Sequence, residues 1–257
     1  FRVYADVTDI TGETHSGETF ISLGYLALKA SITIPDQMPL DSFQSVSLLT
    51  QNLQGQFEPA KGTLRMDLLR NPEQTFVERY WFAPDRQLIP EAEFRKAFPN
   101  YAFKEEDRQE NWEVKKEILE TPFNTAESKT VPIPKAKLEP GVYLLTLETA
   151  DKYGQKIEVK KWVTLFDPSG KKITTDAWGW VHLLKNTLEP GQKAEWLVQT
   201  QAKQIKVLFE VEREGKLLRS EWVDVKKVAR IVHEIQESDR GNIHAHIHYA
   251  GMNRSFN

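Results

Sequence analysis

A strand, an Asp-x-x-Gly turn and a returning strand occur twice in the sequence, and this repeat constrains the fold more than any other feature. The first copy spans Phe1–Leu23 and turns at Asp9–Gly12. The second spans Leu138–Asp167, begins with a Pro-Gly turn and reverses at Asp151–Gly154. Alternating apolar and polar residues on both sides of a glycine-containing turn are typical of a β-hairpin. The sequence therefore predicts the same hairpin at two places.

These two hairpins divide the chain into three predicted units. If the second hairpin closes a domain that begins near Tyr25, the first closes another domain. Asp167–Lys172 contains Pro, Gly and two Lys, a composition typical of a linker. We therefore expect 1–24 to be the closing hairpin of a preceding β-sandwich and 25–167 to be a complete β-sandwich with an insertion. Residues 168–257 are expected to form a second β-sandwich that lacks its last strand.

Short strands at regular spacing dominate the rest of the pattern. Apolar residues alternate along stretches that end at proline or at glycine-containing turns. The predicted strands cover 25–34, 45–51, 61–69, 77–82, 177–184, 193–200, 204–213, 216–223, 228–236 and 242–249, besides the two hairpins. Residues 112–119 fit a strand or a helix equally well. The unit 25–167 then holds about seven strands, the number of an Ig-type sandwich.

One segment interrupts this β pattern. Phe94 and Phe98 lie four residues apart between two prolines, which predicts a short helix over 91–98. Residues 100–111 are charged and aperiodic, as in an insertion or a loop. Residues 122–140 hold four prolines and are expected to be an extended edge segment. The predicted fold class is all-β, with tandem Ig or fibronectin-III-like β-sandwich domains and a short helical insertion.

Composition excludes several classes of protein. Hydrophobic residues make up 40% of the 257 residues, charged residues 28%, and the formal net charge is −3. This balance is typical of a folded globular chain and gives no electrostatic reason to expect nucleic acid as a partner. No stretch approaches the roughly 18 apolar residues of a membrane span, so we expect no membrane contact by this segment. The absence of cysteine excludes disulfides, thiolate nucleophiles and thiolate metal sites.

Three histidines form a candidate metal site. His244, His246 and His248 alternate with apolar residues, so their imidazoles share one face of the predicted strand. Two such histidines can chelate zinc. The apolar residues between them would face the core, however, and we prefer the interpretation of an outward polar face. A zinc titration separates the two.

Tryptophans offer a candidate platform. Trp178 and Trp180 lie two apart, and with Trp196 and Trp222 they could form a flat aromatic surface for a sugar or a partner. Trp178 directly follows the linker, so we favour an inter-domain anchor at this position over ligand binding.

Charged residues near the turns have two possible roles. Asp6, Asp9 and Glu13 surround the first turn and Asp151 the second. Calcium requires six to eight oxygen ligands, so we expect Asp9 and Asp151 to hydrogen-bond the turn backbone instead.

A basic run lies on the strand that returns from the second turn. Lys156, Lys160 and Lys161 alternate with Glu158, which favours a solvated or edge-protecting face over anion binding.

No nucleophile elbow, phosphate-cradling loop or spaced acid–base pair is present in the sequence. We therefore predict no catalytic, cofactor-binding or metal residues and no enzymatic activity.

Four segments carry a resemblance to a known family. The sequence is similar to successive macroglobulin-type domains of bacterial alpha-2-macroglobulin-like proteins, particularly the large ones of Bacteroidetes. The resemblance lies in YADVTDITGETHSG (Tyr4–Gly17), LEPGVYLLTLETADKYGQ (Leu138–Gln155), LEPGQKAEWLVQT (Leu188–Thr200) and VLFEVEREGKL (Val207–Leu217). It implies an exported, commonly membrane-anchored protein that traps proteases through cleavage of a bait segment, rearrangement of the domain array and, in many members, thioester capture.

The sequence departs from that family in its reactive parts. Without cysteine it holds no Cys-x-Glu-Gln thioester. Residues 100–137 are the one long charged bait candidate, although we favour a structural insertion there. Two function classes remain: a non-catalytic structural segment of a protease trap, or a cell-surface adhesion or glycan-binding sandwich array. The expected partners are neighbouring domains of the same polypeptide and, through the whole protein, proteases; the expected location is extracytoplasmic.

Overall fold

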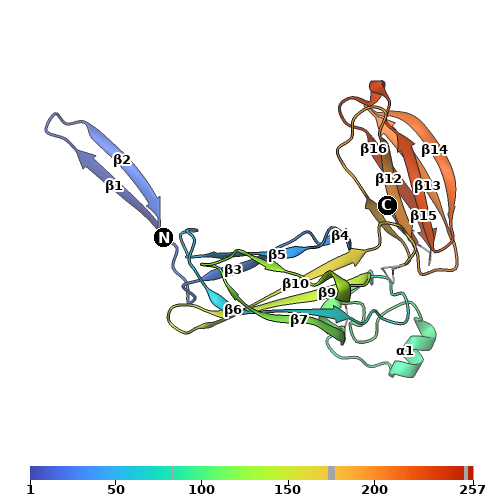
Figure 1. Ribbon diagram of the computed structural model, residues 1–257, viewed down its shortest axis with the longest axis horizontal. Coiled ribbons are helices and arrows are strands. Elements are labelled where there is room, and N and C mark those ends of the chain that lie inside the picture. The colour runs from blue at the N-terminus through green and yellow to red at the C-terminus, as the bar shows by residue number, and fades with distance from the viewer. Residues whose placement is uncertain (83, 173–176, 252–253, 257) are drawn as a thin grey trace.

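The computed structural model describes residues 1–82, 84–172, 177–251 and 254–256. Within them the chain forms strands β1 to β17, one α-helix and three short 3-10 helices. Figure 1 shows two β-sandwiches in series and a separate hairpin at the N-terminal end. The predicted all-β fold class is confirmed.

The first β-sandwich is made of eight strands, where the sequence predicted about seven. They are β3 (Lys29–Thr33), β4 (Gln37–Pro39), β5 (Ser45–Gln51), β6 (Lys61–Leu69), β7 (Val114–Asn124), β8 (Thr130–Pro132), β9 (Gly141–Ala150) and β10 (Lys156–Phe166). One sheet has the order β4-β10-β9-β6-β7 and the other β3-β5-β8. Leu64, Leu145 and Leu147 are fully buried in the core between them.

Prolines mark the edges of these sheets. Pro39 lies in β4, Pro122 in β7 and Pro132 in β8, and all three strands are the outermost of their sheets. Proline cannot donate to a ladder, so an edge is where a sheet accepts it. The predicted edge segment 122–140 is thereby confirmed for its parts in β7 and β8, whereas Lys135–Lys137 form a 3-10 helix. The undecided stretch 112–119 belongs to strand β7 from Val114 on.

The second β-sandwich follows the linker. Its strands are β11 (Trp180–Leu183), β12 (Lys193–Gln199), β13 (Ile205–Arg213), β14 (Lys216–Val225), β15 (Val228–Glu234), β16 (His244–Gly251) and β17 (Arg254–Phe256). The sheets have the orders β11-β12-β15 and β14-β13-β16-β17. Val207, Phe209 and Val211 alternate along β13 and are fully buried. The sequence pattern missed β17; whether the unit lacks a further strand stays a prediction.

Between β6 and β7 the chain leaves the sandwich. Helix α1 (Glu91–Ala97) confirms the predicted helix and buries Phe94. The strand predicted at 77–82 is wrong, because Val77 donates its amide to Asn100 of the insertion at 2.9 Å and no strand among the described residues pairs with it. Three strand predictions also began two or more residues too early, since β3 starts at Lys29, β11 at Trp180 and β16 at His244; residues 173–176 lie outside the described part.

The N-terminal hairpin consists of β1 (Arg2–Thr8) and β2 (Thr14–Phe20). The two strands form a two-stranded sheet of their own, and every residue in them is exposed. In Figure 1 the hairpin extends from the end of the first sandwich that lies away from the second one. The predicted hairpin is confirmed; its membership of a preceding domain stays a prediction.

Candidate functional site

The two Asp-x-x-Gly turns are built alike. In each, the aspartate Oδ1 accepts the backbone N–H groups of the residues two and four positions later, at 2.8 and 3.0 Å for Asp9 and at 2.9 and 2.9 Å for Asp151. Gly12 and Gly154 have φ of 86° and 82°, a left-handed conformation that glycine adopts without strain. The prediction that these aspartates bond the turn backbone is confirmed.

The same turn occurs at two further places that the comparison of hairpins did not include. Asn52 Oδ1 accepts the amides of Gln54 and Gln56, both at 3.0 Å, before Gly55. Asp167 bonds the amides at the same two positions with both oxygens: Oδ1 accepts Ser169 at 2.9 Å and Oδ2 accepts Lys171 at 3.2 Å. An Asn or Asp three residues before a glycine was the signal that could have identified both.

Asp151 makes one contact that Asp9 does not. Its Oδ2 accepts the backbone amide of Ala27 at 2.9 Å, and the two residues are 124 positions apart in the sequence. This amide is the largest influence that lowers the pKa of Asp151, which is buried. The turn at β9–β10 is therefore hydrogen-bonded to the segment around Ala27, by which the chain enters the first sandwich. The pKa of the exposed Asp9 is also lowered, chiefly by the Thr11 hydroxyl.

An aromatic cluster joins the two sandwiches. The ring of Phe166, at the end of β10, lies 5.2 Å from that of Trp180 and 4.3 Å from that of His182, centroid to centroid. Trp180 and His182 stack at 5.7 Å. Phe166 is fully buried, and burial lowers the pKa of His182. The anchor predicted at Trp178 is instead formed by Trp180.

Trp178 packs elsewhere because β11 begins only after it. Its indole lies against Gly251 and joins the core of the second sandwich. Trp196 is also a core residue, whereas Trp222 is exposed beneath Lys206. The four tryptophans therefore do not form the flat platform that the sequence left open.

The insertion makes a second link between the sandwiches. The guanidinium of Arg254, in β17, lies 3.7 Å from the centroid of the Tyr80 ring and donates to the Tyr101 hydroxyl at 3.2 Å. Tyr80 and Tyr101 belong to the insertion of the first sandwich. Two contacts at different places, one aromatic and one cationic, thus connect the two units.

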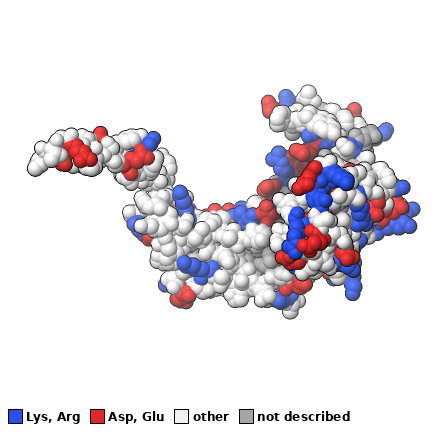
Figure 2. All heavy atoms as spheres, turned by 90° about the horizontal axis from the view of Figure 1, so that it is seen from above, with Lys and Arg blue, Asp and Glu red and all other residues white. Residues whose placement is uncertain are grey.

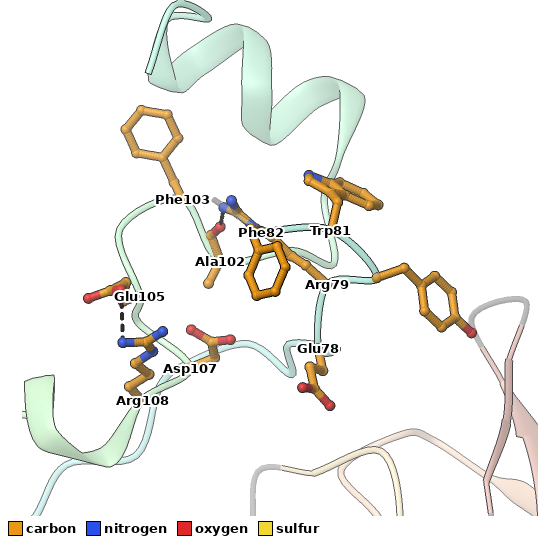
Figure 3. Close-up of a pocket in the computed structure, with 10 residues that line it drawn as sticks. Glu78, Arg79, Trp81, Phe82, Ala102, Phe103, Glu105, Asp107 and Arg108 are labelled. Carbon is orange, nitrogen blue, oxygen red and sulfur yellow. Dashed lines mark hydrogen bonds and ion pairs between the residues drawn. The ribbon is translucent and has the colours of Figure 1, made fainter. Parts of the chain in front are cut away.

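A cavity of about 560 Å³ opens in the insertion. Figure 3 shows Phe82 and Trp81 on one side and the ion pair of Arg108 and Glu105, 3.0 Å apart, on another. Arg79 spans the back, where it donates to the carbonyl of Ala102. An aromatic surface next to charged hydrogen-bonding groups suits an uncharged polar ligand such as a sugar.

The three histidines of β16 lie as an outward face. His244 and His246 are exposed, and the rings of His246 and His248 stack at 5.9 Å. His246 faces Glu212 at 3.8 Å, and Ile247 points into the core. Among the described residues no group of three or more His, Cys, Asp or Glu side chains is arranged to hold a metal ion.

The basic run on β10 also faces solvent. Lys160 pairs with Glu158 at 2.9 Å, and Lys161 pairs with Asp36. β4 pairs only with the last three residues of β10, Thr164–Phe166. Lys156 and Lys160 therefore lie on the part of β10 that β4 does not cover. The edge-protecting interpretation fits this position. Figure 2 shows basic and acidic side chains side by side over the sandwiches.

Comparisons with known proteins identify no family for this chain. No family model and no curated protein matches the sequence. Among solved structures, the native conformation of E. coli alpha-2-macroglobulin is similar over 97% of this chain and 16% of its own, with 11% identity and a TM-score of 0.31. A Ca2+-stabilized adhesin with which an Antarctic bacterium binds ice is similar over 96% of this chain and 54% of its own, with 11% identity and a TM-score of 0.20.

The chain thus spans less than two thirds of either protein. At these values neither similarity assigns a function. In the described residues no helix has the length and apolar character to cross a membrane.

Proposed function

We propose that this chain is a non-catalytic structural segment of an alpha-2-macroglobulin-like protein, and that the whole protein traps proteases outside the cytoplasm. The observation that carries the proposal is the double link between the sandwiches. Phe166 and Trp180 join them at the linker, and Arg254 joins them through Tyr80 of the insertion. A segment whose work is to hold and transmit domain positions needs such packed contacts rather than a reactive site.

Its partners under this proposal are the neighbouring domains of the same polypeptide. Proteases would meet the whole protein rather than this segment, which takes no cofactor, nucleic acid or membrane. Under this proposal the insertion holds the two sandwiches in place through its contacts with Arg254. The bait candidate 100–137 falls partly in β7 and β8, which are paired into sheets.

The absence of cysteine allows a direct test by paired spin labels. Lys152→Cys in the first sandwich and Lys216→Cys in the second place labels at exposed sites of separate units. We expect a narrow distance distribution that broadens when Trp180→Ala and Arg254→Ala are combined. Trp222→Ala, an exposed aromatic away from both links, serves as the matched control. A distribution that is already broad in the unmodified chain would contradict the proposal.

The protease-trap assignment itself requires the longer reading frame. A thioester sequence downstream supports it, whereas repeated adhesin modules or a wall anchor contradict it. Limited proteolysis with several unrelated proteases tests the bait candidate, and we expect no preferred cleavage within 100–137.

The cavity of the insertion favours a second candidate function, binding of a glycan at a cell surface. A glycan array probed with the chain would show binding that Trp81→Ala abolishes. Tyr153→Ala, another exposed aromatic that lies outside the cavity, should leave it unchanged. An array without binding removes this candidate.

A further inference from the structure

The N-terminal hairpin presents one apolar face to solvent. Residues directly opposite in an antiparallel pair share a face, and alternate pairs belong to the same face. Phe1, Val3 and Val7 lie on this face with 81%, 40% and 65% of their surface exposed, and Ile21 opposite Phe1 is 42% exposed. We call this the apolar face; it consists of Phe1, Val3, Ala5, Val7, His15, Gly17, Thr19 and Ile21.

The opposite face combines charged and aromatic side chains, and Tyr4 and Phe20 on it are 63% and 65% exposed. Arg2 pairs with Glu18 at 2.9 Å, and its guanidinium lies over the rings of Tyr4 and Phe20 at 4.8 and 5.5 Å. A charged group that covers two aromatic rings is a suitable surface for water. Both faces are exposed in the described structure, but the apolar face carries no Lys, Arg, Asp or Glu side chain and is therefore the side suited to a covering sheet. In Figure 2 the arm is mostly uncharged, with separate acidic and basic side chains on it.

The second hairpin shows what covers such a face. When Asp9 is set against Asp151, Val3 takes the position of Leu145 and Ala5 that of Leu147. Both leucines are fully buried against the opposite sheet of the first sandwich. The same turn and the same register thus lead to a covered face in one hairpin and to an exposed face in the other.

The edge of β1 that faces away from β2 is also unpaired. Phe1 and Ile21 exchange both backbone hydrogen bonds at 2.8 Å, and the amide of Asp9 bonds Glu13 at 2.9 Å. In an antiparallel pair every second residue directs its N–H and C=O away from the partner strand. Those residues of β1, here called the open edge, are Arg2, Tyr4, Asp6 and Thr8. The corresponding edge of β9 is paired with β6 along its length.

Asp9 completes the correspondence. Its Oδ1 accepts the turn amides, as in Asp151, but among the described residues nothing donates to its Oδ2. In Asp151 that second oxygen accepts the amide of Ala27, in the segment that enters the sandwich. An exposed carboxylate oxygen held in the same orientation is free to accept the corresponding amide of another sandwich.

We propose that β1–β2 is the last hairpin of a β-sandwich that precedes it in the same polypeptide. A strand of that sandwich runs antiparallel to β1 along the open edge, as β6 does along β9. Its opposite sheet covers the apolar face, and its entering segment donates one backbone amide to Oδ2 of Asp9. This inference rests on the proposed function only in that both describe one segment of a domain array.

Amide exchange followed by NMR tests this geometry. The 257-residue chain is compared with a chain extended on its N-terminal side by about 100–150 residues of its own reading frame, the size of one domain. We expect exchange at the four open-edge amides to slow by about 100-fold or more in the extended chain. Unchanged exchange at these amides, or a reading frame without a preceding sandwich, would overturn the proposal.

Matched variants in the extended chain locate the contact. Asp6→Pro removes one open-edge N–H and leaves the β1–β2 ladder intact, so it should abolish the protection, whereas Asp6→Ala should retain it. Asp9→Asn retains the turn, as Asn52 shows, but replaces the accepting oxygen by a donor, and should weaken the protection. Equal effects of Asp6→Pro and Asp6→Ala would contradict pairing along this edge.

A second copy of this chain is the competing occupant. Sedimentation of the 257-residue chain distinguishes it: a monomer fits the proposal, whereas a dimer with a protected open edge overturns it. The spin-label test of the junction is independent, because Phe166 and Trp180 lie at the other end of the first sandwich. Failure of one measurement therefore leaves the other intact.

Discussion

The hairpins β1–β2 and β9–β10 have the same turn and the same register, but their environments differ completely. Every strand residue of the first is exposed, while most of β9 is buried between sheets. The turn depends on one aspartate and one glycine, which act over four residues and fold alike in both places. Burial depends on other strands. The comparison shows that local sequence specifies a hairpin and that its neighbours decide whether it becomes part of a core.

The side chains on the apolar face of β1–β2 also differ in size from those at the corresponding positions of β9–β10. Val3 and Ala5 stand where β9 has Leu145 and Leu147, and Gly17 stands where β10 has Val159. Smaller residues allow a closer approach of the covering sheet. The N-terminal hairpin would therefore contribute less apolar area per residue to its sandwich than β9–β10 contributes to the first.

Truncation of the corresponding core residues gives the largest expected contrast. Leu145→Ala should lower the free energy of unfolding of the first sandwich by about 2–5 kcal/mol, because it leaves a cavity in a closed core. Val3→Ala in the same chain should change it by less than about 0.5 kcal/mol, since its side chain is exposed. Urea denaturation measures both changes in the free energy of unfolding. A comparable loss for the two variants would mean that the hairpin packs on this chain.

The two turn aspartates give the next contrast. Asp151→Asn keeps the turn but removes the acceptor for Ala27, so we expect the melting temperature of the first sandwich to fall by about 3–6 °C. Asp9→Asn should shift it by less than about 1 °C, because in the described structure the donors to Asp9 all bond Oδ1 and none bonds Oδ2. Differential scanning calorimetry reads both shifts.

Acid should reveal the same difference between the aspartates. The folded-state pKa of Asp151 is lowered, so its contribution to stability is present above the unfolded value near 3.8 and is lost as the pH falls through the folded value. Asp151→Asn should remove that part of the acid dependence. If the variant lost as much unfolding free energy in acid as the unmodified chain, the Ala27 contact would be excluded as the cause of that loss.

Alkali should lower stability through Tyr143 of the covered hairpin. Tyr143 in β9 is fully buried, and burial raises its pKa to about 12. The unfolded chain releases this proton near pH 10, so stability should decrease between about pH 10 and 12. Phe1 stands at the corresponding position of the first hairpin, and its side chain carries no ionisable group.

Tyr143→Phe should remove that alkaline loss. At neutral pH it should cost about 1 kcal/mol, because Glu139 loses the hydroxyl that bonds its backbone at 2.6 and 2.9 Å. Denaturant unfolding at pH 7 and at pH 11 measures both effects. A variant that remains as sensitive to alkali as the unmodified chain would assign the loss to another group.

Much of this architecture can be predicted from the sequence, since alternation and turn chemistry act locally. The Asp-x-x-Gly turns, the edge prolines and the helix around Phe94 all follow from residues within a few positions. The strand predicted at 77–82 had the alternation but not the partner, because Arg79 and Val77 bond the insertion instead. Alternating apolar and polar residues indicate that a strand has two different faces, but they do not identify the element that covers the apolar one.

Long-range contacts explain what the sequence could not show. No local signal links Asp151 to Ala27, or Arg254 to Tyr80. The spacing of Trp178 and Trp180 implied a common face, but β11 starts at Trp180 and the two rings enter different surroundings. The turn aspartates were thus predictable in role, whereas the anchor and the cavity of the insertion required the structure.

Amide exchange in the unextended 257-residue chain tests the central claim most directly, namely that the two hairpins share a turn and a register but only β9–β10 is covered by other strands. The open-edge amides of Tyr4 and Asp6 should exchange at nearly unprotected rates. Their counterparts Thr146 and Glu148, which face β6, should exchange only when the first sandwich unfolds. Equal protection of the two sets in a monomeric chain would contradict the account.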